Sequence, residues 1–214
     1  MARVMADWLL EAWSFQAGRP SCTTVMPDGC QDLLCITDVD GRSQWKWAPL
    51  TDGAYQVQCE VSEQFQGWRL RPGCQVDIDG LLQALSGRDA TYDPVGVLGD
   101  FVRLSEGTTQ ALRALADCRS VQLACRQLGV AERSLFRHLL KESGRSPVYW
   151  RQLARARRAA QGLRSAMPLA DLATKHGYAD QAHFSREMRR WFGASPQALR
   201  INSAALDAIE LAGY

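Results

Sequence analysis

Apolar and polar residues follow two different patterns along the 214-residue chain. Between residues 8 and 78, strand-length runs are separated by turn formers such as Pro-Asp-Gly and Arg-Pro-Gly, which predicts a series of short strands. Three of these runs are Gln31–Ile36, Ala54–Val61 and Gln66–Arg71. From about residue 108 onward, apolar residues recur three and four positions apart, which is the spacing of helices with one buried face.

The second pattern predicts helices over residues 109–118, 121–130, 132–143 and 147–165. Residues 80–87 predict a brief helix, and residues 86–106 form an ambiguous connection. The expected fold class is therefore α+β, with a small β-rich N-terminal domain over residues 1–105 and an all-α domain over residues 106–200. Residues 201–214 form a partly apolar tail to which the sequence assigns no function.

The helical half contains an internal repeat. Gly129 recurs as Gly177, and the segment Gly144–Pro147 recurs 49 residues later as Gly193–Pro196. Each copy reads as a short helix, a glycine turn, a second helix and a Gly-x-Ser-Pro segment, in which glycine closes a helix and Ser-Pro begins the next. This spacing is that of a helix-turn-helix, so two such units joined by a long helix are expected.

Charge divides the chain in the same way. Residues 1–110 hold 8 Lys and Arg against 15 Asp and Glu, whereas residues 111–214 hold 17 against 8. Fifteen of those 17 basic residues are arginines, the side chain best suited to phosphates and guanine edges. The basic half is therefore expected to face a polyanion.

Residues 110–200 resemble the DNA-binding domain of AraC/XylS-type transcriptional regulators, most closely over Gly177–Pro196. Met188 departs from the Phe usual in that family, and Ala131 departs from a common capping Ser. The segments Met26–Leu34 and Trp68–Gly73 are similar to motifs of a small β-rich domain that precedes some of these DNA-binding domains. The resemblance implies a non-enzymatic transcription factor with a sensor domain, which binds double-stranded DNA and works with RNA polymerase.

The second helix of each unit is expected to enter the major groove. With Leu135 and Phe184 turned inward, the residues expected to read base edges are Arg133, Arg137, Gln181, His183 and Arg186. For each of them, a solvated helix surface or, for His183, a capping role is the alternative. The helix that begins at Pro147 serves as a spacer, and its candidate phosphate contacts are Arg151, Arg155 and Arg158.

Two reading helices on one spacer allow a single protomer to contact successive major-groove segments about 34 Å apart. The oligomeric state therefore stays open. No stretch approaches the ~20 apolar residues of a membrane span, so a cytoplasmic location and no membrane partner are expected.

The front half is expected to sense a small molecule or a partner protein. Trp45 and Trp47 share one face of a predicted strand and, with Asp32, are the candidate lining of a ligand pocket. Core packing is the alternative for the two tryptophans, because aromatic side chains bury large areas in any fold.

A different class of function would use the cysteines of the front half. Cys30, Cys35, Cys59 and Cys74 are candidates for a thiolate metal sensor or an alkyl-acceptor DNA-repair regulator. The sequence lacks the closely spaced Cys pairs of most such sites, so no metal and no cofactor are expected. It also lacks phosphate-cradling glycine motifs and nucleophile motifs, which leaves no indication of an enzyme.

Overall fold

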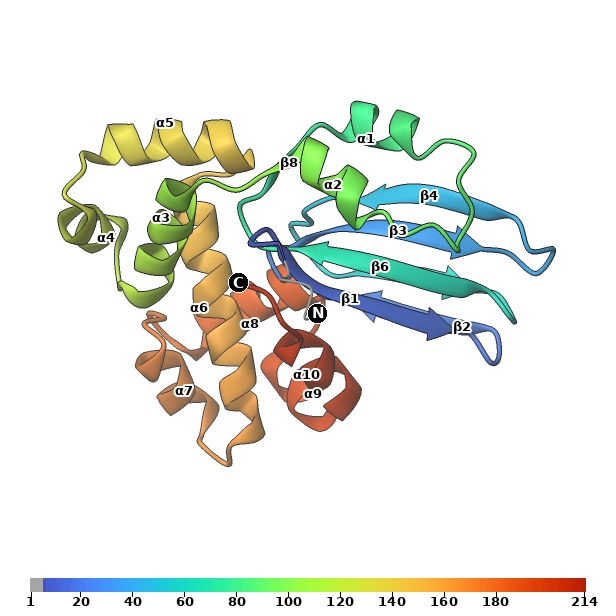
Figure 1. Ribbon diagram of the computed structural model, residues 1–214. Coiled ribbons are helices and arrows are strands. Elements are labelled where there is room, and N and C mark those ends of the chain that lie inside the picture. Colours follow the sequence, from blue (N-terminus) through green and yellow to red (C-terminus); the bar gives the residue numbers. More distant parts are fainter. Residues whose placement is uncertain (1–5) are drawn as a thin grey trace, which may run out of the picture.

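The computed structural model describes residues 6–214 and shows a β-rich region beside a helical region (Figure 1). The first five residues of the expected N-terminal domain lie outside the described part. The strands are β1 (Leu9–Gln16), β2 (Ser21–Val25), β3 (Gln31–Thr37), β4 (Ser43–Ala48), β5 (Tyr55–Cys59), β6 (Gln64–Leu70), β7 (Gln75–Val76) and β8 (Val102–Arg103). The expected α+β class and the order of the two regions are thus confirmed.

The larger sheet is antiparallel and has the strand order β1-β6-β3-β4, while β2 pairs with β5 and β7 with β8. Helices α1 (Ile78–Ala84) and α2 (Val95–Phe101) cover one face of this sheet (Figure 1). Leu33 and Trp68 of the sheet pack there against Leu81 and Leu98 of the two helices. On the opposite face, Phe65 packs with residues of the β2–β5 pair.

The helical region contains α3 (Glu106–Asp117), α4 (Val121–Leu128), α5 (Glu132–Ser143), α6 (Pro147–Gln161), a 3-10 turn (Gly162–Arg164), α7 (Leu169–Lys175), α8 (Gln181–Phe192), α9 (Pro196–Ile201) and α10 (Ser203–Glu210). Helix α6 runs through the middle of this region, with α3 and α4 toward one end and α7 toward the other (Figure 1). Among residues 6–214, none of the helices combines the length and apolar character that crossing a membrane requires.

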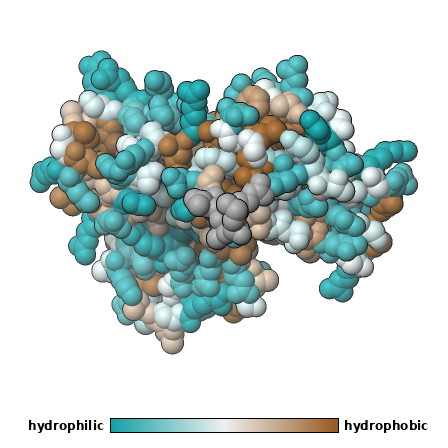
Figure 2. All heavy atoms as spheres, viewed as in Figure 1, coloured by the Kyte–Doolittle hydropathy of each residue, from teal (hydrophilic) through white to brown (hydrophobic). Residues whose placement is uncertain are grey.

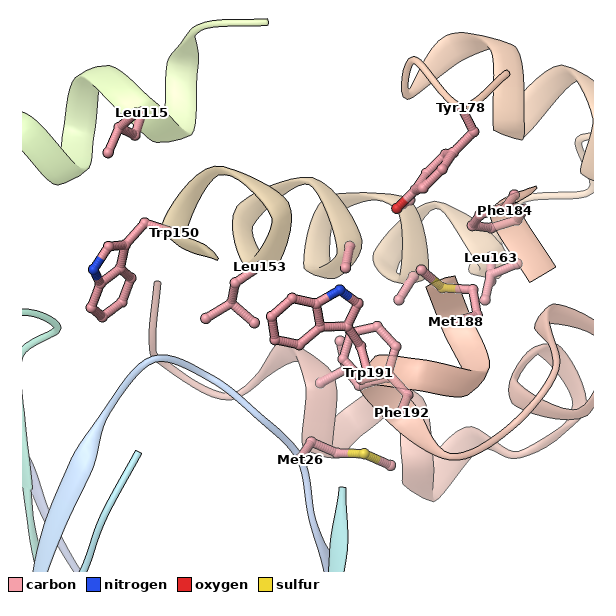
Figure 3. Packing of buried hydrophobic residues seen from close by; sticks show 14 of the residues in the cluster. Met26, Leu115, Trp150, Leu153, Leu163, Tyr178, Phe184, Met188, Trp191 and Phe192 are labelled. Atoms are coloured by element: carbon pink, nitrogen blue, oxygen red, sulfur yellow. The ribbon is translucent and has the colours of Figure 1, made fainter. Parts of the chain in front are cut away.

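A single core surrounds α6. Trp150 and Leu153 of α6, Phe184 and Trp191 of α8 and residues of α3 to α5 and α10 are buried in it. Met26 of the β-rich region joins the same core and approaches Trp191 and Phe192 from below (Figure 3). The two regions therefore share buried apolar contacts as well as a chain connection.

The β2–β3 loop forms the centre of the contact between the regions. Arg157 of α6 is 3% exposed and donates to the Pro27 carbonyl at 3.3 Å and to the Leu211 carbonyl at 2.7 Å. The Tyr214 backbone N–H donates to the Asp28 carbonyl at 2.7 Å, and its hydroxyl donates to the Leu112 carbonyl at 2.7 Å. The tail thus fills a space between the two regions, a role that the sequence did not indicate.

Gly29 lets the loop approach α6 closely. Its φ of +80° is a conformation that favours glycine, and an added Cβ would lie 2.8 Å from the Tyr214 Cβ and 2.9 Å from the Trp150 ring. The β4–β5 connection makes a second contact, in which the Ala54 N–H donates to the Trp191 carbonyl at 2.9 Å and Arg145 pairs with Asp52 at 3.0 Å.

Candidate DNA-binding surface

The helical region contains two helix-turn-helix units of matching geometry. In the first, the Val130 N–H donates to the Cys125 carbonyl at 3.1 Å, and in the second the Tyr178 N–H donates to the Ala173 carbonyl at 2.9 Å. The turn glycines Gly129 and Gly177 have φ values of +68° and +72°. The repeat in the sequence therefore corresponds to a repeated structure, α4–turn–α5 and α7–turn–α8.

The two units are closed in the same way. Gly144 and Gly193 end α5 and α8 in the left-handed conformation. Ser146 and Ser195 then accept a hydrogen bond from the backbone N–H three residues later, each at 3.2 Å. This shared closure fixes where α6 and α9 leave their units.

The units differ at the start of the second helix. Asp180 caps α8 by accepting from the His183 N–H at 2.6 Å, whereas Ala131 at the same place in α5 makes no side-chain cap. As the sequence predicts, Ala131 occupies the N-cap position of α5 and makes no side-chain hydrogen bond there.

The predicted base-reading arginines lie on exposed helix faces. Leu135 and Leu139 of α5 are buried, and Arg133 and Arg137 of the same helix are exposed. In α8, Arg186 is exposed in the same way. Within residues 6–214, no hydrogen bond or ion pair is found for these three guanidinium groups. Their donors are therefore available to a partner such as a base edge.

Gln181 and His183, the two other residues predicted to read bases, differ in how far their side chains are already engaged within the protein. Gln181 is exposed at the first position of α8. The ring of His183 lies edge-on to Tyr178 at 5.3 Å between centroids, and its Nδ1 accepts from the Ala179 N–H at 3.3 Å. This arrangement favours a structural role for His183 at the turn and leaves only its Nε2 for DNA.

The three predicted phosphate-binding arginines of α6 line one cleft of about 360 Å³ between the two units. Arg119, Lys175, His176 and the acidic Asp117 also line this cleft. Burial, with the charges of Lys175 and Arg158, lowers the pKa of His176, so the positive charge comes from the arginines and the lysine. A cleft with this concentration of positive charge suits a phosphate backbone.

Two of these arginines also hold the units in place. Arg151 donates to the Arg119 carbonyl at 2.8 Å, just before α4 begins. Arg155 donates to the Gly177 carbonyl at 3.2 Å and covers the Tyr178 ring at 4.3 Å. Arg158 is exposed and has no such contact among the described residues, so it is the freest of the three.

The prediction that Trp45, Trp47 and Asp32 together line one ligand pocket is wrong, because Asp32 lies on the opposite face of the sheet from the two tryptophans. Asp32 accepts from the Trp13 Nε1 at 3.2 Å and from the Arg69 Nε at 3.1 Å, which is a structural role. Trp45 and Trp47 lie on the other face of the sheet, because their pairing partners on β3 are Cys35 and Leu33.

Each tryptophan has its own surroundings. Trp45 packs on Trp68 at 5.5 Å between ring centroids and donates to the Arg88 carbonyl at 3.0 Å. It lines a separate open cleft of about 380 Å³ with residues 86–89. Trp47 is partly buried against the core under α1 and α2 and does not line this cleft.

The structure does not assemble the four candidate thiolates of the alternative function. Cys35 and Cys74 belong to the core under α1 and α2, and Cys59 belongs to the core on the opposite face. Within residues 6–214, no group of three or more His, Cys, Asp or Glu side chains is placed to hold a metal ion. All seven cysteines are free thiols.

Sequence reasoning missed part of the exposed faces of α5 and α8. Phe136, Leu140 and Arg189 are exposed, and the spacing i, i+3, i+4, i+7 places them beside the predicted arginines. Counting at this spacing from Arg133 and Arg186 would have found them.

These two helix-turn-helix units define a DNA-binding domain. Residues 124–202 match the model of a family described as a helix-turn-helix domain. This match covers less than half of the chain and lies almost entirely within residues 110–200, the stretch whose sequence resembles the AraC-type DNA-binding domain. No curated protein matches the chain.

Solved structures of ToxT from Vibrio cholerae resemble the chain as a whole. An apo form is 10% identical with a TM-score of 0.42, and the alignment covers 92% of this chain and 98% of that chain. A form with bound unsaturated fatty acid is 11% identical with a TM-score of 0.42, covering 92% and 96%.

Proposed function

We propose that this protein is a sequence-specific, non-enzymatic regulator that places α5 and α8 in successive major-groove segments of double-stranded DNA. The observation that carries the proposal is the pair of exposed arginines, Arg137 and Arg186, at equivalent positions of the two units. The basic cleft between the units supports it, since this cleft lies where the DNA backbone between two major-groove segments would approach. RNA polymerase is the partner that such a regulator implies.

The β-rich region is proposed to receive a signal, from a small molecule or a partner protein, and to pass it to α6. The support is the buried contact of the Pro27–Gly29 loop with Arg157 and Trp150. Because α6 also joins the two reading helices, a shift of this loop would change their relative position.

Affinity measurements on a DNA site selected from a random pool test the first part. Arg137→Ala and Arg186→Ala should each weaken specific binding by about 1–3 kcal/mol and relax the preference at one position. Arg42→Ala is the matched control, because it removes an exposed arginine from the β3–β4 turn. Unchanged specific binding by both arginine variants would exclude this surface as the reading surface.

A further inference from the structure

The exposed faces of the two reading helices differ in chemistry. On α5 the outward stripe consists of Arg133, Phe136, Arg137 and Leu140. The residues 49 positions later on α8 are Ala182, Ser185, Arg186 and Arg189. A phenyl ring therefore stands on α5 where α8 has a small hydroxyl side chain.

The phenyl ring is accessible. Phe136 is 46% exposed and Leu140 is 48% exposed. Figure 2 shows apolar side chains gathered over α4 and the adjoining end of α5. A large aromatic side chain left this open loses the free energy of burial that it would gain under a partner.

Phe136 lines a groove of about 430 Å³ between α4, α5 and the start of α6. Pro147 and Val148 add further apolar surface to this groove, and its charged lining consists of Arg133, Arg151 and Glu132, which gives two positive charges and one negative charge. An apolar floor whose charged edge is net positive fits a polyanion that presents an apolar group. Double-stranded DNA is such a partner, because its major groove displays the C5 methyl group of thymine between two phosphate backbones.

We propose that Phe136 is a specificity-determining residue that selects a thymine by packing against its 5-methyl group. A phenyl ring has no hydrogen-bonding group, so it distinguishes bases by burial, and cytosine lacks the methyl group that would be buried. Arg133, about one turn of helix before Phe136, and Arg137, directly after it, supply the hydrogen bonds to neighbouring bases or phosphates. The inference rests on the proposed function of this surface and adds which base one half of the site requires.

Deoxyuridine substitution tests the inference, because deoxyuridine keeps the hydrogen-bonding edge of thymine and lacks only the methyl group. In the site selected by the full-length protein, each thymine is replaced in turn. One replacement in the α5 half of the site should weaken binding about fourfold, the value for loss of one buried methyl-sized group.

The Phe136→Ala variant should bind the thymine and deoxyuridine sites equally well at that position, and Phe136→Leu should retain part of the difference. Ser185→Ala changes the matching position of α8 and should keep the full wild-type difference. Because Phe136 is exposed, the variants should melt at the wild-type temperature, which checks their folding.

Two results would overturn the inference: no single replacement weakens binding, or Phe136→Ala keeps the wild-type ratio between the two sites. Either result together with a loss of affinity in Arg137→Ala would leave the proposed function intact. If the pool yields no specific site, the proposed function itself is wrong, and the inference is wrong with it.

Discussion

Position 67 has no room for a side chain larger than that of glycine, because the Trp13 indole occupies the adjacent space. An added Cβ would lie 2.2 Å from the Trp13 Cε2 atom, and this indole donates to the buried Asp32. The indole therefore crosses β6 to reach β3, and Gly67 is the position it crosses.

Gly67→Ala should lower the free energy of unfolding by about 1–3 kcal/mol, because the indole must move and Asp32 loses a donor. Gly96→Ala is the control, since nothing lies within 4 Å of its added Cβ on α2. In a helix this control should stabilise by about 0.5–1 kcal/mol. Equal effects of the two variants in chemical denaturation would contradict the packing of Trp13 on Gly67.

The free thiols should differ strongly in reactivity. Cys22 is exposed and Cys118 is partly exposed, whereas the other five are buried. Burial raises the pKa of Cys74 to about 12 and raises the pKa of Cys30 well above its ordinary value. At pH 8 these two thiols therefore stay protonated, and a thiolate is the reactive form.

Alkylation of the native protein at pH 8, followed by mass spectrometry, should modify Cys22 first and Cys118 more slowly. Cys22→Ser should remove the fast phase and leave the remaining order unchanged. Rapid modification of Cys30 or Cys74 in the native protein would show that the β2–β3 loop or the β6–β7 turn opens freely.

At the scale of a single element, the missing side-chain cap at the start of α5 lowers the stability of this helix. Ala131 has the extended backbone of an N-cap, with φ −73° and ψ 147°, yet its methyl group accepts no hydrogen bond. Ala131→Ser should therefore raise the free energy of unfolding by about 1 kcal/mol.

The matched variant is Ser120→Ala, which removes the existing cap of α4, a hydrogen bond of 3.2 Å from the Leu123 N–H. It should lower stability by a similar amount. Thermal melting measures both changes, and a destabilised Ala131→Ser would show that the α5 terminus already satisfies its backbone groups in another way.

At the level of elements, much of the helical region could be predicted. The repeat placed the turn glycines and the buried Leu135 and Phe184, because helix packing leaves a periodic signal in the sequence. Helix α2 lay in the connection that stayed ambiguous, since Gly96 and Gly99 give it low helix propensity. Burial of Leu98 against the sheet favours this helix, and a local pattern does not reveal such a contact.

The candidate site was predicted less completely than the fold. Periodicity identified Arg137 and Arg186 but did not show that Arg151 and Arg155 donate to backbone carbonyls of the two units. The contact of Arg157 with Pro27 joins residues 130 positions apart. Nothing in the sequence near either residue indicates that contact, because it depends on how whole regions pack.

At the scale of the whole molecule, substitutions of two adjacent arginines of α6 should affect different properties, stability in one case and DNA binding in the other. Arg157 is buried between the regions, and Arg158 is exposed in the basic cleft. Burial lowers the pKa of Arg157, and the nearby Asp28 charge acts in the opposite direction. The two arginines therefore lie on different surfaces of α6, Arg157 in the contact between the regions and Arg158 in the basic cleft.

Arg157→Ala should lower the free energy of unfolding by about 2 kcal/mol or more, because the Pro27 and Leu211 carbonyls lose a charged donor. Arg158→Ala should leave stability nearly unchanged and reduce the slope of log K against log salt for DNA by about 1. Denaturation and salt titrations of both variants give this crossed comparison. If Arg158→Ala destabilised the protein as much as Arg157→Ala, the two surfaces of α6 would not be separate.

The stripe of α6 formed by Trp150, Leu153 and Arg157 makes the two regions poor candidates for exchange between proteins. A hybrid that joins another β-rich region before α3 would keep α5 and α8 but lose the partners of this stripe. It would expose an arginine and an indole that had been covered. The unit that can be transplanted is therefore discontinuous in the chain: the β-rich region, this stripe of α6 and residues 211–214 would have to move together.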